Sequence, residues 1–261
     1  MAIKIAVMSM KGGQGKTALS VNLADRISKA NRNVLLIDSD MQANVTTIFQ
    51  RDHVCNLANL ILGEIKEFEF LQINKRFSIL PSGGKQMVEA ARYISNSRFR
   101  ETVIKNLLAP LNHSVIIFDC APSWNEVNEN ILMYVDYVII PVVTDYLGYS
   151  GCDQVMTYIE DLKNDARGLC HADILGIAIT RFNSRTNISK TILHGLHKRW
   201  PDLVFKSLIE ESVSIQEAPA YHNSIFNYKN GKTRGARMYE KLCKEIAMRI
   251  AEKQKAFSPN Q

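Results

Sequence analysis

Short apolar runs alternate with longer amphipathic stretches along the chain. The apolar runs, which predict strands, occupy residues 3–9, 33–40, 113–123, 136–143 and 172–182. Continuous apolar runs of this kind are typical of strands buried on both faces. Leu19, Leu23 and Ile27 have helical spacing within residues 17–30, and further helices are expected near 85–108, 148–165 and 187–199. The alternation predicts an α/β fold, in which helices cover both faces of a mostly parallel, twisted sheet.

Polar segments follow three of the predicted strands. A glycine-rich stretch follows the strand at 3–9, Asp38 and Asp40 end the strand at 33–40, and Asp119 lies in the strand at 113–123. In open parallel sheets, ligands bind at the carboxyl ends of the strands. We therefore expect these segments to meet at one ligand site.

The glycine-rich stretch, "KGGQGKT" at residues 11–17, joins a predicted strand to a predicted helix. Such a turn aims backbone N–H groups and the positive end of a helix dipole at one point, which suits phosphate groups. Lys16 is expected to reach the β- and γ-phosphates, and the Thr17 hydroxyl to hold Mg²⁺. The strict pattern G-x-x-x-x-G-K-[ST] fails, because Met10 stands where its first glycine belongs.

The variant K-G-G-x-G-K-[ST] is matched at every position, and it resembles the deviant Walker A P-loop of the ParA/MinD family of ATPases. This resemblance implies a single-domain P-loop NTPase over residues 1–261, with ATP and Mg²⁺ as cofactors. It also implies that Lys11 crosses the interface of an ATP-sandwiched homodimer and touches the partner's phosphates. The residues that it assigns to nucleotide binding are Lys11, Gly12, Gly13, Gln14, Gly15, Lys16, Thr17, Ala18, Asp38, Asp119 and Asn183.

Two acidic segments support the resemblance. Asp119 follows "VIIF" and precedes "CAP", as does a Walker B acid that holds magnesium through water. "DSDMQAN" at 38–44 resembles the family's D-x-D-x-Q-x-N segment, which assigns Asp40 to orienting the attacking water and Asp38 to the neighbourhood of phosphate and magnesium. The implied catalytic residues are thus Lys11, Lys16 and Asp40. Met41 and Ala18 depart from the family, which usually has proline and threonine there.

The C-terminal half continues the resemblance to about residue 250. "ITRFNSRTN" at 179–187 resembles the segment that holds the adenine, with Asn183 as the candidate base contact. An ordinary strand-to-helix loop is the alternative. "GARMYEKLCKEI" at 235–246 resembles the family's last helix, and residues 254–261 are expected to form a disordered tail.

The net charge of +6 is concentrated near the C-terminus, where residues 229–255 hold nine basic and three acidic side chains. Such a segment fits sequence-independent contact with DNA phosphates, although a solvated helix face is the alternative. Glu211 and Ser214 stand where Soj-type members carry arginines, so DNA contact must use other residues. The candidates are Arg181, Arg185, Arg234, Arg237, Lys241 and Lys244.

The composition argues against several other classes of protein. The five cysteines are scattered and form no C-x-x-C pair, so neither a disulfide framework nor a zinc site is indicated, and an iron–sulfur reductase is disfavoured. We find no apolar run long enough to span a bilayer and no signal peptide. We expect a cytoplasmic, nucleoid-associated protein that does not bind membranes.

The leading hypothesis is a Soj-like partition ATPase that positions a plasmid, a chromosome or another cargo. The resemblance implies that ATP closes the homodimer, that the dimer binds DNA nonspecifically, and that a ParB-like or other cargo-bound partner stimulates slow hydrolysis. A MinD-like membrane switch and a metabolic P-loop enzyme are the alternatives.

Overall fold

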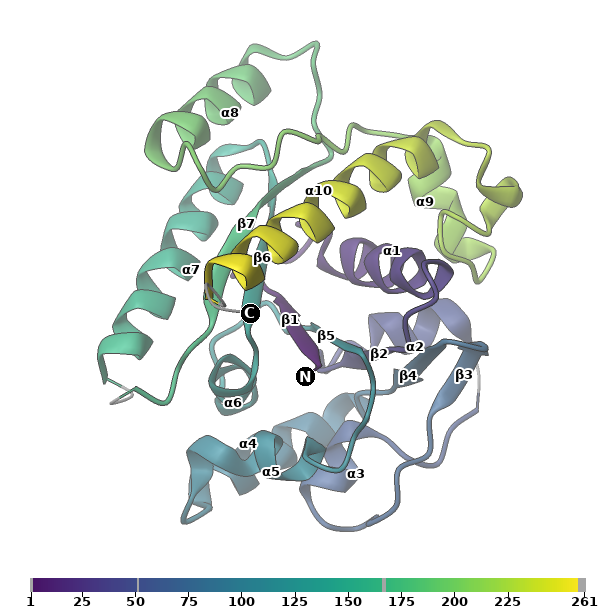
Figure 1. The fold of residues 1–261 in the computed structure, drawn as a ribbon, viewed down its shortest axis with the longest axis vertical. Helices are drawn as coiled ribbons and strands as arrows, with labels where there is room; N and C mark the ends of the chain where they lie inside the picture. Colours follow the sequence, from purple (N-terminus) through teal and green to yellow (C-terminus); the bar gives the residue numbers. More distant parts are fainter. Residues whose placement is uncertain (1, 51, 166–167, 258–261) are drawn as a thin grey trace.

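A computed structural model describes residues 2–50, 52–165 and 168–257, which form one sheet flanked by helices (Figure 1). The sheet has the order β3-β4-β2-β5-β1-β6-β7, and every neighbouring pair is parallel except β3 and β4. The predicted α/β class with a mostly parallel sheet is confirmed. The strands are β1 (Ile3–Val7), β2 (Val34–Asp38), β3 (Leu71–Asn74), β4 (Phe77–Leu80), β5 (Val115–Asp119), β6 (Tyr137–Val143) and β7 (Asp173–Thr180).

Helices connect the strands and cover both faces of the sheet. The α-helices are α1 (Lys16–Lys29), α2 (Asn44–Phe49), α3 (Leu57–Ile61), α4 (Met87–Asn96), α5 (Val103–Leu108), α6 (Glu126–Tyr134), α7 (Tyr146–Asp165), α8 (Asn187–Arg199), α9 (Val213–Ala220) and α10 (Arg234–Phe257). Three short 3₁₀ turns are η1 (Gly84–Gln86), η2 (Arg100–Thr102) and η3 (Tyr228–Gly231).

One predicted helix is wrong in its extent. Residues 85–108 form two α-helices, α4 and α5, rather than one, because Ser97 leaves the helix with an extended backbone at φ −76° and ψ 140°. The other predicted strands and helices are confirmed to within a few residues, except that the last helix, predicted over 235–246, continues to Phe257.

Alternate residues of the central strands enter two cores. Leu35 and Ile37 of β2 pack on the face covered by α3 to α7, whereas Val34 and Leu36 pack on the face covered by α1 and α10. Figure 1 shows these two layers on opposite sides of the sheet. Burial on both faces explains why these strands read as continuous apolar runs.

The last helix belongs to the second core. Tyr239, Leu242 and Ile246 of α10 are buried there, and α10 lies beside α1 on the same face of the sheet (Figure 1). The helix continues to Phe257, so it takes in the first four residues of the predicted disordered tail at 254–261. The other four, 258–261, lie outside the described residues.

All five cysteines are buried free thiols. Cys55, Cys120, Cys152 and Cys170 lie in the core shared with α3 to α7, and Cys243 lies in the core under α10. Within the described ranges, no helix combines the length and apolar character needed to cross a bilayer.

Candidate nucleotide site

The glycine-rich loop connects β1 to α1 at the carboxyl end of the sheet. Gly13 and Gly15 have φ angles of 77° and 83°, in the left-handed region that favours glycine. The Gln14 side chain fixes the loop to the strand edge, because its Oε1 accepts a hydrogen bond from the Val143 backbone N–H at 2.7 Å. The Gln14 carbonyl accepts another from the Thr180 hydroxyl at 2.8 Å. The loop is thus held in shape by β6 and β7.

Lys16 lies buried within this loop. Its Nζ donates a hydrogen bond to the Lys11 carbonyl oxygen at 3.3 Å, and within the described residues it forms no ion pair. Burial lowers the pKa of Lys16, while the charges of Asp119 and Asp40 act in the opposite direction. A buried ammonium with only a neutral acceptor is a suitable partner for an anionic phosphate.

Asp119 ends β5 and faces the first turn of α1. Its Oδ2 accepts a hydrogen bond from Thr17 Oγ1 at 2.7 Å, and its Oδ1 accepts one from Ser20 Oγ at 3.0 Å. Burial raises the pKa of Asp119 to about 6. Sequence reasoning placed Thr17 and Asp119 together but missed Ser20, although Ser20 lies one turn after Lys16 on the same helix.

A magnesium ion fits these groups. Among the described residues, no three side chains of His, Cys, Asp or Glu gather into a metal cage. Mg²⁺ usually takes only one or two protein groups and completes its shell with water and phosphate oxygens. The Thr17 hydroxyl and the Asp119 carboxylate, 2.7 Å apart, meet that requirement.

Asp38 and Asp40 have different surroundings. Asp38 is fully buried, and its Oδ2 accepts hydrogen bonds from the Val45 and Thr46 backbone N–H groups at 3.1 and 3.3 Å. Burial and the charge of Asp119 raise the pKa of Asp38 to about 8. The Asp38 carboxylate therefore shapes the loop that carries Asp40, whose Oδ1 accepts a hydrogen bond from the Gln42 N–H at 2.9 Å.

Lys11 points to the surface rather than into the loop. Its Nζ lies 3.7 Å from Asp145 Oδ2, just before α7, and about a third of its side chain is exposed. Asp145 is held in turn, since its Oδ1 accepts a hydrogen bond from the Gly148 N–H at 2.6 Å. No sequence motif pointed to Asp145, because the contact depends on how α7 approaches the loop. A β-carbon on Gly148 would lie 2.1 Å from the Val143 carbonyl oxygen, so only glycine permits this approach.

A pocket of about 320 Å³ adjoins the loop through Gly15 and Ala18. Ile209, Ile215 and Arg181 are among its other lining residues. Asn183, the predicted base contact, does not line it. Asn183 lies in a neighbouring hollow, where its Nδ2 donates a hydrogen bond to Glu211 Oε2 at 3.2 Å.

The six predicted DNA-contacting residues do not share one environment. Arg181 lines the pocket beside the loop, and Arg185 and Arg234 line the neighbouring hollow. Arg234 is paired with Glu210, and Lys244 lies 3.2 Å from Glu240. The other four are exposed and have no ion-pair partner in the described part of the chain. They are Arg181, Arg185, Arg237 and Lys241.

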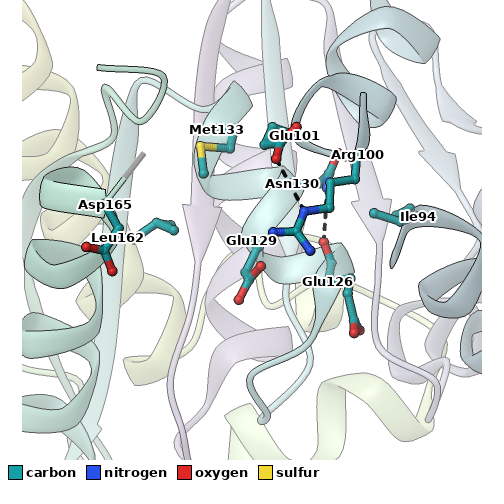
Figure 2. Close-up of a pocket in the computed structure, with 9 residues that line it drawn as sticks. All are labelled: Ile94, Arg100, Glu101, Glu126, Glu129, Asn130, Met133, Leu162 and Asp165. Carbon is teal, nitrogen blue, oxygen red and sulfur yellow. Dashed lines mark hydrogen bonds and ion pairs between the residues drawn. The ribbon is translucent and has the colours of Figure 1, made fainter. Parts of the chain in front are cut away.

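Another cavity, of about 170 Å³, lies between α4, α6 and α7 (Figure 2). Arg100 projects among its carboxylates and lies 3.3 Å from Glu101. Glu126, Glu129 and Asp165 add further negative charge, and none of the predicted site residues lines this cavity. An acidic lining repels phosphates, so this cavity is not the nucleotide site.

The loop, the buried Lys16 and the pair formed by Thr17 and Asp119 define a P-loop nucleotide-binding site. Comparison with known proteins gives the family: residues 2–169 match the AAA domain family that includes ParA-type proteins, and the chain belongs to it. The chain is thus a P-loop ATPase of the ParA/Soj family.

Three relatives illustrate the similarity. The sporulation initiation inhibitor protein Soj of Bacillus subtilis is 28% identical over 252 residues, which cover 93% of this chain and 97% of Soj. McdA of Cyanothece superposes with a TM-score of 0.84 at 22% identity, covering 95% of this chain and all of that chain. A plasmid partition protein of Borrelia burgdorferi, solved with AMPPNP bound, gives a TM-score of 0.79 at 23% identity, covering 97% of this chain and all of that one.

Proposed function

We propose that this chain is an ATP-dependent dimerising ATPase that partitions or positions DNA or another cargo. Nonspecific DNA binding by the dimer and hydrolysis stimulated by a ParB-like or other cargo-bound partner complete the cycle. The observation that carries the proposal is the separation of the two loop lysines. Lys16 is buried within the glycine-rich loop, whereas Lys11 reaches the surface, where a second subunit can meet it.

Each site residue has a defined task in this proposal. Backbone N–H groups of residues 12–17 and the Lys16 ammonium bind the phosphates. Thr17 and Asp119 hold Mg²⁺, which neutralises charge on the phosphate oxygens, and Asp40 orients the attacking water. Asp40 is buried on a loop that Asp38 fixes, which suits a positioning role.

The surroundings of α10 favour partition over a membrane switch. A membrane switch needs an amphipathic helix that can leave the domain. The apolar side of α10 is instead part of the core, through Tyr239, Leu242 and Ile246. Exposed basic side chains on the same helix, Arg237 and Lys241, suit phosphate contact with nucleoid DNA.

The two lysines provide the test. Lys16→Ala should abolish binding of Mg–ATP, measured by calorimetry, because it removes a buried charge from the phosphate cradle. Lys11→Ala should still bind ATP but weaken the dimer by about tenfold to a hundredfold, since a charge-assisted contact contributes about 1.5–3 kcal/mol. Sedimentation with a non-hydrolysable ATP analogue measures the dimer.

Asp145→Asn is the matched control. It removes the partner of Lys11 within the subunit but keeps the Oδ1 that accepts from Gly148, so it should leave the ATP-dependent dimer intact. A dimer of unchanged strength in Lys11→Ala would contradict the proposed contact with the second subunit.

A further inference from the structure

Helix α8 lies against α7 at the outer edge of the molecule (Figure 1) and has a solvent face without negative charge. Its inner side is part of the core, where Ser189 and Leu196 are buried. No acidic residue occurs in the sequence between Asp173 and Asp202. The residues of the exposed side, which recur at helical spacing, are Asn187, Lys190, Thr191, His194, His197 and Lys198.

The cations of this face are unpaired. Within the described part of the chain, the ammonium groups of Lys190 and Lys198 have no hydrogen-bond or ion-pair partner. Arg185, just before the helix, is exposed and has no ion-pair partner there either. Arg199 differs, because its Nη2 lies 3.6 Å from Asp153 Oδ1 of α7. Three positive side chains are therefore available to a ligand along α8.

The charges of α8 are not placed to stabilise the helix itself. An acidic residue near the start of a helix and cations near its end favour the helix dipole. The first turn of α8 has no acid, and Arg185 directly precedes the N-cap residue, Thr186, where a cation is unfavourable. On α10, by contrast, glutamates neutralise Lys244 and Arg249. A face with cations and no acids instead attracts an external anion.

This face fits a nucleic-acid backbone better than a protein. Its side chains are all polar, whereas the centres of protein interfaces depend on aromatic and other large apolar anchors. Lys190 and Lys198 are about 12 Å apart along the helix axis, a length over which one DNA strand carries a charge every 3.4 Å or so. Asn187 and Thr191 add amide and hydroxyl donors of the kind that contact phosphates.

We propose that α8 forms a DNA-backbone surface in which Lys190 and Lys198 contact phosphates, an inference that rests on the proposed DNA-binding function. The sequence-based candidates included Arg185 but no residue of α8. Arg185 lines the same hollow as Arg234, the first residue of α10. The α8 surface thus adjoins the start of α10, and DNA contact extends beyond the C-terminal basic segment.

Replacement of Lys190 and Lys198 by alanine tests the surface. In the presence of a non-hydrolysable ATP analogue, binding to unrelated duplexes is measured by anisotropy at a series of salt concentrations. The slope of log K against log salt should flatten by about two units for each subunit on the duplex, and affinity should fall equally for all sequences. A slope and affinity equal to those of the wild-type protein would overturn the proposal.

Two further variants separate charge from folding. Lys190→Arg with Lys198→Arg keeps both charges and should retain the wild-type slope. Lys66→Ala with Lys105→Ala removes two exposed cations on or beside α3 and α5, far from α8 (Figure 1), and should bind DNA as the wild-type protein does. The α8 alanine variant should still bind Mg–ATP in calorimetry, since none of the nucleotide-site residues lies on α8.

Lysine acylation followed by mass spectrometry tests the same contact without a substitution. Saturating duplex DNA should slow the modification of Lys190 and Lys198 several-fold and leave Lys66 and Lys105 as reactive as before. Protection of the α8 lysines by polyglutamate but not by DNA would overturn the proposal and indicate an acidic protein as the ligand.

The outcomes also distinguish this inference from the function on which it rests. If the wild-type protein with the ATP analogue binds no duplex, the proposed DNA binding fails as well. If it binds duplexes, but the α8 variant binds equally and the α8 lysines stay reactive, only the assignment of α8 fails.

Discussion

At the scale of single residues, the main feature of the nucleotide site is a pair of buried carboxyl groups. Asp38 and Asp119 lie opposite each other on neighbouring strands β2 and β5, and both are almost fully buried. Charged carboxylates are costly to bury without compensating cations. Lys16 supplies one positive charge, so the site has surplus negative charge that bound Mg²⁺ can compensate.

This surplus predicts a pH-dependent stability of the nucleotide-free protein. The pKa values of about 6 for Asp119 and about 8 for Asp38 exceed that of an unfolded aspartate, near 3.9, so the folded state retains protons that the unfolded state releases. The free energy of unfolding should therefore fall as the pH rises from about 4 to about 8. Urea unfolding at a series of pH values measures this dependence.

Asp38→Asn should reduce the fall in stability between pH 6 and pH 8, because the amide does not titrate. Asp145→Asn, which changes a half-exposed carboxyl group, serves as the control and should follow the wild-type pH dependence. An Asp38→Asn protein with the same loss of stability over this range would refute the assignment.

Local sequence was sufficient to predict the residues of the phosphate loop. Gly13, Gly15, Lys16 and Thr17 lie in one continuous segment, and their order between a strand and a helix defines their geometry. The contacts of Lys11 with Asp145, and of Glu211 with Asn183, join segments that are distant in sequence. Such contacts depend on tertiary packing, so no spacing rule could predict them.

Among the helices, α10 packs one face into the core and exposes cations on another. Its cations are unequal, because Lys244 is paired with Glu240, while Arg237 and Lys241 are exposed and have no ion-pair partner among the described residues. Arg249 is occupied inside the fold, where it donates hydrogen bonds to the carbonyl oxygens of Leu175, Leu203 and Val204. The basic composition of this segment therefore overstates the charge available to a partner.

Replacement of Arg237 and Lys241 by alanine should reduce the salt dependence of DNA binding. Each phosphate contact contributes about 0.9 to the slope of log K against log salt, so the slope should flatten by about two units. Filter binding or anisotropy with unrelated duplexes, in the presence of ATP, gives the slope. Lys66→Ala with Lys105→Ala, which removes two exposed cations from the opposite face, should leave it unchanged. An unaltered slope in the α10 variant would mean that these side chains are only solvated.

Element length decided which parts of the fold could be predicted. The long helices α1, α7, α8 and α10 and the central strands were predicted because several apolar positions repeat within each. The short elements α2, α3, β3 and β4 contain four to six residues each, too few for a helical or strand periodicity to be distinct. The split between α4 and α5 was missed because apolar residues continue on both sides of Ser97.

At the scale of the whole molecule, the carboxyl edge of the sheet gathers every part of the nucleotide site. The phosphate loop, Asp40, Asp119 and the pocket beside Gly15 all lie there, and the side chain of Lys11 reaches the surface at this edge. The two cores lie on either side of the sheet and are built from separate sets of side chains. The nucleotide site and the two hydrophobic cores thus occupy different parts of one domain.

The five buried thiols can report, through their reaction rates, on how each of the two cores opens. Burial raises the pKa of Cys120 and of Cys243, so both react with a disulfide reagent only when the chain around them opens. Cys120 follows Asp119 in one core, and Cys243 lies in the other. Mg–ATP should slow modification of Cys120 more than that of Cys243, as followed by mass spectrometry. Equal protection of both thiols would instead indicate that the molecule opens as a single unit, and the labelling rates would then measure its global unfolding.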